Sequence, residues 1–382
     1  MIQGDLGQPR MLRFLMMLTI ASAAGLQSWM ILFNNFAVDV AGLNGQQIGV
    51  IGSVREIPGL LAFLVVYVLL ILREHHLCAL SIIIVGAGSI MTGFMPTFSG
   101  LIISTLVLSF GFHYFETTNQ SLTLQYFDKR RAPLVFGKLR SLSAAVNIAA
   151  GGAVFCLGFL FEYKTIFVVI GVFVLLLGAW GFTQRPIDQH LPPQRRDMVV
   201  RRKYALFYFL TCMSGARRQI FIAFAVFLMV KEFDCSVVQV AALFIVNNLV
   251  NYFLSPVIGR AIVRYGERKV LTLEYASLIV VFVGYAWADS LALIMFLYIA
   301  DHIFFNFAIA IRTYFQKIAD PEDIAPSMAV SFTINHLAAV VLPVLGGALW
   351  MIDYRIPFLA GAGMSLISLV AVQWIRIEPT PS

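Results

Sequence analysis

Charged residues are scarce in this chain. Only 12% of its 382 residues are Asp, Glu, Lys or Arg, whereas a soluble domain carries about 25%. Apolar residues make up 60% of the sequence, and the mean hydropathy is +0.85. This number of charges is too small to cover the surface of a water-soluble protein of this length. The composition therefore predicts a membrane protein.

Signatures of several other protein classes are also missing. The four cysteines (Cys78, Cys156, Cys212 and Cys235) share no metal-binding or redox spacing, so no disulfide framework is predicted. Gly-rich stretches such as "GAGSIM" and "GAGMSL" lack the lysine of a phosphate-binding loop, so this chain does not encode ATP-driven pumping. No hydrolase-type arrangement of Ser, Cys or metal ligands occurs. We therefore predict no enzyme, no cofactor and no resident metal.

Long apolar runs dominate what is present. A helix needs about 20 mostly apolar residues to cross a bilayer, and lipid allows only helices or closed barrels. The runs are continuous rather than alternating, which predicts an all-α membrane protein. The first run is too long for a signal peptide and contains Gln27, so we expect it to be retained. Twelve spans are predicted, at about 12–38, 46–72, 76–95, 100–126, 134–160, 164–183, 204–230, 237–262, 270–288, 290–316, 326–351 and 356–376.

The basic residues predict the topology. Of the 27 lysines and arginines, three (Lys164, Lys231 and Arg355) fall on outer loops and three within spans, which leaves 21 on the inner side. This bias predicts that both termini are cytoplasmic. We attribute the net charge of +7 to topology rather than to nucleic-acid binding. The expected protein is a multi-pass monomer of a bacterial cytoplasmic (inner) membrane.

An internal repeat divides the chain in two. The longest polar stretch, "RPIDQHLPPQRRDMVVRRK", follows the sixth span. It predicts a cytoplasmic linker, 184–203, between an N-terminal six-helix bundle, 1–183, and a C-terminal one, 204–382. The halves align in a common order, with Gln27 on Gln219, Gln47 on Gln239, Arg55-Glu56 on Asn247-Asn248, His113 on His302, and "EYKTIF" on "DYRIPF". Six spans repeated in parallel fit a transporter with its site between the bundles.

A loop motif carries a resemblance to a known family. "GRAIVRYGERK", between the eighth and ninth spans, matches the loop signature G-x-x-x-D-R-x-G-x-R-K at Gly259, Arg264, Gly266, Arg268 and Lys269. The chain in this respect resembles the major facilitator superfamily, although Val263 replaces the usual aspartate. The first-half copy, "LLILREHHL", keeps little beyond Arg73. In that family the loop belongs to a charge network that latches one conformation.

The resemblance has implications for the site. In the resembled fold, spans 1, 4, 7 and 10 line a central cavity, spans 2, 5, 8 and 11 form the seam, and every third span is peripheral. The ionisable residues follow this division, because spans 3, 6 and 12 have none in their interiors and span 9 has only Glu274. We assign seam or gating roles to Arg55, Glu56, Asn247, Asn248, Gly259, Arg264, Gly266 and Arg268.

Polar residues near the middle of the spans are the candidate site. A charge in hydrocarbon is costly, so such residues usually face a cavity or a partner. At about 100° per residue, Arg218 shares a stripe with Ser214 and Gly215, while Arg217 points away. We therefore expect Arg218 in a cavity and Arg217 paired with a carboxylate on another span. The full set of substrate candidates is Arg218, Arg217, Gln27, Gln219, Asn147, Asn335 and Asn306.

The chemistry of these residues leaves alternatives open. Arginine is suited to a carboxylate or phosphate, so Arg218 indicates an anionic substrate, unless it forms a structural ion pair with Glu116 or Asp301. Midplane carboxylates beside histidines are typical of proton relays. The proton-coupling candidates are Asp301, His302, Glu116, His113 and His336, although each single histidine is more readily explained by packing. A metal site built from these histidines with Asp301 or Glu116 is a lesser alternative, because the ligand types fit but the spacings carry no metal-ligand signature.

These features favour one function over two others. We predict a secondary active transporter that moves a small organic anion by alternating access, coupled to protons. The alternative is a proton-driven exporter of hydrophobic or cationic compounds, for which the 33 phenylalanines could supply an apolar wall. A membrane enzyme or sensor on such a scaffold would need large soluble domains or catalytic loops, which the sequence lacks.

Overall fold

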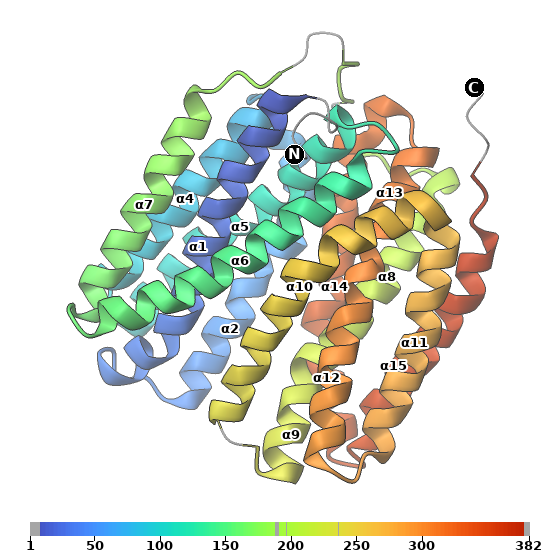
Figure 1. Ribbon diagram of the computed structural model, residues 1–382. Coiled ribbons are helices and arrows are strands. Elements are labelled where there is room, and N and C mark those ends of the chain that lie inside the picture. The colour runs from blue at the N-terminus through green and yellow to red at the C-terminus, as the bar shows by residue number, and fades with distance from the viewer. Residues whose placement is uncertain (1–7, 188–190, 196, 236, 378–382) are drawn as a thin grey trace. The chain divides into compact units, whose positions relative to one another are not determined.

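The computed structural model describes residues 8–187, 191–195, 197–235 and 237–377, and within these ranges all regular structure is helical. The α-helices are α1 (Pro9–Asp39), α2 (Gly45–Leu60), α3 (Val65–Val68), α4 (Glu74–Phe94), α5 (Phe98–Tyr126), α6 (Ala132–Gly158), α7 (Tyr163–Thr183), α8 (Ala205–Ile220), α9 (Val226–Phe233), α10 (Val237–Tyr265), α11 (Glu267–Trp287), α12 (Leu291–Phe305), α13 (Ile309–Ile318), α14 (Ile324–Trp350) and α15 (Arg355–Ala371), as labelled in Figure 1. Short 3₁₀ and π segments connect some of them.

Helix occupies every range that the sequence predicts as a span. Among the described residues, ten helical stretches are long and apolar enough to cross a bilayer. The two other predicted ranges, 204–230 and 326–351, are occupied by α8 with α9 and by α14. The all-helical membrane fold is therefore confirmed, and the count of twelve crossings stays a prediction.

The chain forms two compact units that interleave in sequence. Unit 1 consists of Met1–Phe127, Leu142–Val199 and Pro321–Thr333, and unit 2 of Asp128–Ser141, Val200–Asp320 and Ile334–Ser382. Two helices, α6 and α14, therefore contribute one end to each unit. Unit 2 ends at Ser141 within α6, so Arg140 belongs to unit 2.

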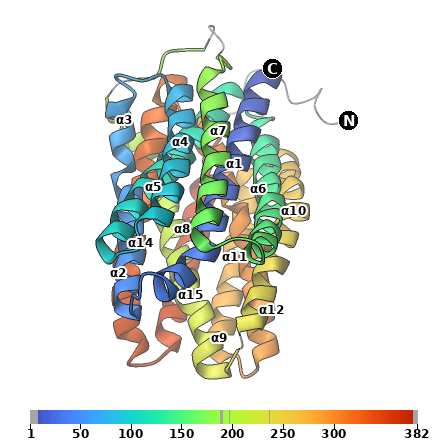
Figure 2. The ribbon, with the colours of Figure 1, turned by 90° about the vertical axis from the view of Figure 1, so that its left-hand side faces the viewer.

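In unit 1 the helices α1, α4, α5 and α7 pack closely. Helix α4 packs against α5 and α7, and α1 packs against α7; Figures 1 and 2 show α1, α4 and α7 side by side from two directions. The approach depends on small residues. A Cβ atom on Gly86 would lie 2.7 Å from the carbonyl oxygen of Gly171, and one on Gly88 would lie 2.5 Å from the backbone nitrogen of Leu108.

Helix α2 loses regular geometry near its C-terminal end. Pro58 lies inside it and removes one backbone donor. After Leu60 the chain continues as a 3₁₀ turn, Leu61–Leu64, and then as α3. The backbone N–H of Phe63 donates to the hydroxyl of Thr333 at 2.9 Å. A side chain thus satisfies a backbone group that the broken helix leaves free, which is a requirement for irregular structure at membrane depth.

In unit 2 two helices are interrupted. A π-helical segment, Phe221–Ala225, joins α8 to α9, and a 3₁₀ turn, Asn306–Ala308, joins α12 to α13. Around the first interruption, Phe221, Phe224 and Leu228 enter a core that also contains side chains of α11, α12 and α15. Single π turns inside α-helices occur frequently at functional sites. The two interruptions directly follow Arg217-Arg218 and His302, which the sequence selects as candidates.

The two ends of the linker are anchored by ion pairs. In unit 1, Arg195 Nε lies 2.7 Å from the buried carboxylate of Asp323. In unit 2, Lys203 Nζ lies 2.6 Å and Arg201 Nη1 3.0 Å from the carboxylate of Asp320. The hydrogen bond to Asp320 raises the pKa of Lys203. The connection between α7 and α8 is therefore fastened at 195 and at 201–203 to the short connection between α13 and α14.

The glycine packing of unit 1 predicts the effect of one methyl group. In Gly86→Ala the new Cβ would meet backbone atoms of α7, which cannot move without the helix. We expect a loss of about 1–3 kcal/mol, as for other overpacked sites, visible as a lower thermal midpoint of the purified protein in detergent. Gly363→Ala in α15 is the matched control, because its Cβ would meet nothing within 4 Å. Equal midpoints for the two variants would contradict this packing.

Candidate functional site

The two adjacent arginines of α8 have opposite environments. The side chain of Arg217 is fully buried in unit 2, whereas Arg218 is exposed. The guanidinium of Arg218 lies 5.8 Å from the ring centroid of Phe305 on α12. Successive helical residues point about 100° apart, so a single turn of α8 presents one charge to the interior and one outward. The stripe correctly turns Arg217 away from Arg218, and the prediction that Arg218 faces a cavity stays a prediction.

Arg217 lies in a charged pocket made by three helices. Its Nη2 is 3.8 Å from Oε1 of Glu274 on α11, its Nη1 donates to the hydroxyl of Ser368 on α15, and its guanidinium lies 4.5 Å from the ring centroid of Tyr275. The predicted pairing of Arg217 with a carboxylate on another span is confirmed. The stacking on Tyr275 adds a cation–π contact in a site without water access.

A second carboxylate faces the same pocket. Asp301 on α12 is 1% exposed, and its charge acts on both Arg217 and Glu274. Among the described residues, neither oxygen of Glu274, nor Oδ2 of Asp301, nor Nε and Nη2 of Arg217 has a hydrogen-bond partner. One guanidinium thus faces two buried carboxylates, and a buried charge without a partner is strongly unfavourable. Binding one proton would bring this cluster to zero net charge.

The next residue on α12, His302, lies in a polar network. Asn251 Nδ2 lies 3.0 Å from His302 Nε2, and Asn306 donates both to Asn251 Oδ1 and, at 2.6 Å, to the His302 carbonyl. Arg140 Nε donates to Asn306 Oδ1 at 3.2 Å. A 3₁₀ turn begins at Asn306 and interrupts the α-helix at this point, and interrupted helices are typical of transport sites.

Two arginines act on this network from different helices. The positive charges of Arg140, from α6, and Arg218, from α8, both act on the His302 ring, and both side chains are exposed. Arginine presents a planar fork that matches carboxylate or phosphate groups. Unit 2 therefore combines two cationic groups, an imidazole and two amides, which together suit an anion.

Other candidates in unit 2 have structural partners. Asn335 on α14 donates to the Thr211 carbonyl of α8 at 3.4 Å, and its backbone fills the space where Gly215 has no Cβ. Asn247 is buried on α10, while Asn248 donates to the Phe244 carbonyl one turn earlier in the same helix. Gln219 and His336 are partly buried. Asn335 therefore holds α14 in close contact with α8.

The loop motif of α10 and α11 has clear local reasons. Gly259 packs against the Pro133 carbonyl of α6, and Gly266 has a φ of +80° at the start of α11, where a side chain would be strained. Arg268 donates to Gln373 Oε1 at 3.0 Å, and the Arg264 guanidinium lies 5.3 Å from the ring of Tyr265. These contacts account for the glycines and order the loop. The gating role assigned to the motif stays a prediction.

The candidates of unit 1 form short-range contacts. His113 on α5 bonds through Nδ1 to the hydroxyl and carbonyl of Ser109, at 3.0 and 2.8 Å, and Ser109 donates to the Arg55 carbonyl of α2. Glu116 accepts from Gln120 at 3.2 Å. These contacts are compatible with a packing role for His113, and its part in proton coupling stays a prediction.

Four further candidates of unit 1 are partly buried. Arg55 and Glu56 form an ion pair at 3.1 Å with each other, so the charges neutralise within α2. Gln27 on α1 and Asn147 on α6 are partly buried. A cavity of about 120 Å³ between α1 and α2 is lined in part by Trp29, Phe33 and Arg55.

Sequence reasoning missed several residues of the unit 2 site. Glu274 is assigned to a peripheral span near its inner end, but α11 begins at Glu267, which places Glu274 two turns inside. Arg140 is counted with the inner basic residues that set the topology. Both residues could have been found from the sequence, since each is a charged residue within a predicted span. Nothing in the sequence distinguishes the other three residues, Tyr275, Ser368 and Asn251, because a single polar residue in a span is common.

The comparisons with known proteins agree with this architecture. A membrane protein of packed, interrupted helices with a polar interior defines the class of multi-pass transporters. The family model described as Major Facilitator Superfamily matches residues 11–335 and 207–382. The chain belongs to this superfamily, whose members are transporters and not enzymes, and it is a multi-pass integral membrane protein with a small-molecule substrate. No curated protein matches the sequence at a significant level.

Solved structures share the fold at low sequence identity. The human organic anion transporter MFSD10 (TETRAN) has 12% identity and a TM-score of 0.75, with 96% of this chain and 100% of that chain covered. A bacterial homologue of the iron transporter ferroportin in an outward-facing state has 14% identity, a TM-score of 0.72 and coverage of 95% and 98%. FucP, a transporter of the same superfamily in the outward conformation, has 11% identity, a TM-score of 0.76 and coverage of 96% and 98%.

The buried charge cluster predicts an asymmetric effect of two neighbouring substitutions. Arg217→Met leaves two carboxylates in a dry interior, and we expect a loss of stability of about 3–5 kcal/mol, as for other broken buried pairs. Arg218→Met, on the exposed side of the same turn, should change stability little. Thermal unfolding in detergent measures both.

The double variant Arg217→Met/Glu274→Gln is the control for charge. It removes one positive and one negative group, so part of the lost stability should return. If Arg217→Met were as stable as Arg218→Met, the buried pair would not have the structural role described here.

Proposed function

We propose that this protein is a secondary active transporter that moves a small organic anion by alternating access, coupled to protons. Its twelve spans would form bundles at 1–183 and 204–382, joined by the cytoplasmic linker 184–203, with both termini in the cytoplasm. We place it, as a monomer, in a bacterial inner membrane. The membership in a transporter superfamily supports the transport mechanism, and the basic residues support the topology.

One observation supports an anion as the substrate. Arg218 and Arg140 are exposed side chains whose charges act together on His302, beside the Asn251–Asn306 amide network. An anionic group would be held by two guanidiniums and by amide donors, and arginine keeps its charge at any pH at which the protein functions.

The structural neighbours are compatible with several cargoes. One neighbour is an organic anion transporter, one is a homologue of an iron transporter, and the third is FucP. At 11–14% identity they share the fold alone. The first of them adds support to the anion hypothesis, which still rests on the arginines of this chain.

The buried cluster supports proton coupling. Arg217 faces both Glu274 and Asp301 in a water-free interior of unit 2, and one bound proton would balance the charges there. Asp301 and His302 are consecutive on α12. Protonation of Asp301 would therefore change the charge directly beside the polar network around His302. The carboxylate Asp301 is therefore the foremost coupling candidate, ahead of Glu116, His113, His302 and His336.

Replacing Arg218 tests the anion site. A thermal-shift screen of the wild type with mono- and dicarboxylates and sugar phosphates, at two pH values, first identifies the ligand. Arg218→Gln should then reduce uptake of that anion into proteoliposomes by at least about tenfold, since one charge-assisted contact is worth about 1.5–3 kcal/mol. Arg260→Gln, an exposed arginine of α10, should transport normally. Unchanged transport by Arg218→Gln would contradict the anion hypothesis.

Replacing Asp301 tests the coupling. Asp301→Asn keeps the shape of the side chain but cannot exchange a proton, so we expect proton-driven accumulation to be lost while counterflow exchange of the anion continues. A pH-sensitive dye inside the proteoliposomes measures the proton flux. Proton-driven accumulation at the wild-type level would exclude Asp301 as the coupling group.

A second substrate class is favoured by a different observation. The cavity between α1 and α2 is lined by the aromatic rings of Trp29 and Phe33, stacked at 4.3 Å, which suits a hydrophobic or cationic compound. The protein would then be a proton-driven exporter. Cells that express the protein should in that case resist a panel of lipophilic cationic dyes, and Arg218→Gln should leave the resistance unchanged.

A further inference from the structure

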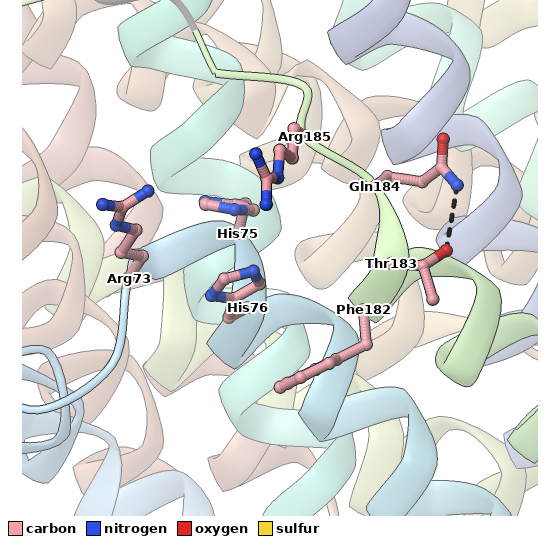
Figure 3. Close-up of a pocket in the computed structure, with 7 residues that line it drawn as sticks. All are labelled: Arg73, His75, His76, Phe182, Thr183, Gln184 and Arg185. Atoms are coloured by element: carbon pink, nitrogen blue, oxygen red, sulfur yellow. Dashed lines mark hydrogen bonds between the residues drawn. The ribbon is translucent and has the colours of Figure 1, made fainter.

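A basic cavity lies at one end of unit 1, where α4 begins and α7 ends. Its volume is about 410 Å³, within the range of about 300–1,000 Å³ that is usual for small-ligand sites. Figure 3 shows its lining residues, Arg73, His75, His76, Phe182, Thr183, Gln184 and Arg185. Two arginines and two histidines face this space, and no carboxylate lines it. The function proposed above makes no use of these residues.

The start of a long helix contributes to the cavity. Arg73 is the N-cap residue of α4, and its side chain makes no capping hydrogen bond to the first turn. The first backbone N–H groups of a helix favour an anion. Glu74, in this first turn, does not take that place, because its Oε2 accepts a hydrogen bond from Gln125 of α5 at 2.7 Å. The acidic side chain is therefore directed to α5, and the helix start stays available to a ligand.

A buried, unsatisfied imidazole points to a missing ligand. His75 is 2% exposed, and its Nε2 has no hydrogen-bond partner among the described residues. Its ring is held 4.1 Å from that of His76, which in turn stacks on Phe182 at 4.9 Å. A buried polar atom without a partner is costly. An anion oxygen in the cavity would accept from this ring, and Figure 3 shows the Arg185 guanidinium beside it.

The cavity lies where apolar helix surface gives way to basic ends. Ile71, just before α4, is 86% exposed and Phe182, at the end of α7, is 40% exposed, as expected of surface in contact with lipid. The Arg13 guanidinium, at the start of α1, lies 6.0 Å from the Trp180 ring of α7, so basic residues gather at this end of unit 1. Phosphate groups of phospholipids occupy this level of a membrane.

We propose that this cavity binds the phosphate group of an anionic ligand, either the headgroup of an anionic phospholipid or a soluble phosphate ester. Arg73 and Arg185 supply two forks for the phosphate oxygens, His75 donates from Nε2, and the start of α4 adds backbone N–H groups. The site consists only of residues of unit 1, and its occupancy would hold the start of α4 against the end of α7.

Two arms of one experiment distinguish the sources of phosphate. In the first, native mass spectrometry of the full-length protein counts bound phosphatidylglycerol against phosphatidylcholine. In the second, the thermal midpoint is measured in phosphatidylcholine nanodiscs with and without glycerol phosphate. The test variants are Arg73→Gln/Arg185→Gln and His75→Phe, which keeps a ring on His76 but removes Nε2. The control is Arg130→Gln/Arg376→Gln, two exposed arginines at other helix ends.

A lipid ligand predicts a selective loss in the first arm. Affinity for phosphatidylglycerol should fall by about tenfold for each arginine removed and also fall in His75→Phe, with the control like the wild type. A soluble ligand predicts instead that glycerol phosphate raises the midpoint of the wild type and control but of neither test variant. Lipid binding and midpoints that are the same in all proteins would overturn the proposal. Because transport of the anion identified above is not the readout, failure here leaves the transport function untouched.

Discussion

The burial of one guanidinium constrains much of unit 2. Arg217 cannot lose its charge, so the helices around it must supply opposite charge and hydrogen-bond partners. Glu274 comes from α11, Ser368 from α15 and Asp301 from α12, which means that four helices meet at a single side chain. The cluster provides more carboxylates than it needs for neutrality. A proton is the smallest species that can correct this excess, and the proton coupling proposed above rests on it.

Helix α12 also carries part of a second polar layer, together with α10 and α6. Asp301 and His302 are neighbours in sequence but differ in environment, because Asp301 faces Arg217 and His302 contacts Asn251. The two layers are therefore separated by one peptide unit on α12, and the 3₁₀ turn at Asn306 lies one turn further on. Arg140 reaches this layer from α6, which contributes its first ten residues to unit 2. A guanidinium from outside the C-terminal half of the sequence thus takes part in the network.

Sequence reasoning located the helices but not which polar residues of different helices contact one another. Hydropathy is a property of a segment, so the ranges of α1 or α7 could be predicted to within a few residues. The stripe on α8 separated Arg217 from Arg218 because both lie on one helix of known periodicity. Glu274 and Ser368 could not be assigned to Arg217, since no pattern within a helix tells which helix lies next to it. Arg140 was missed for another reason. A basic residue near the inner end of a span is expected from the topology alone, so it does not by itself indicate a binding site.

A π segment, Phe221–Ala225, follows the turn of α8 that carries the two arginines. A π turn contains one residue more than an α turn, and adjacent residues of an α-helix differ in direction by about 100°. If the extra residue moved along α8 from 221–225 to a point before residue 217, every side chain between would turn by one position. Arg218 would then point in the direction that Arg217 now takes. The bulge thus makes α8 a helix whose charge pattern depends on backbone register, without any change in its length.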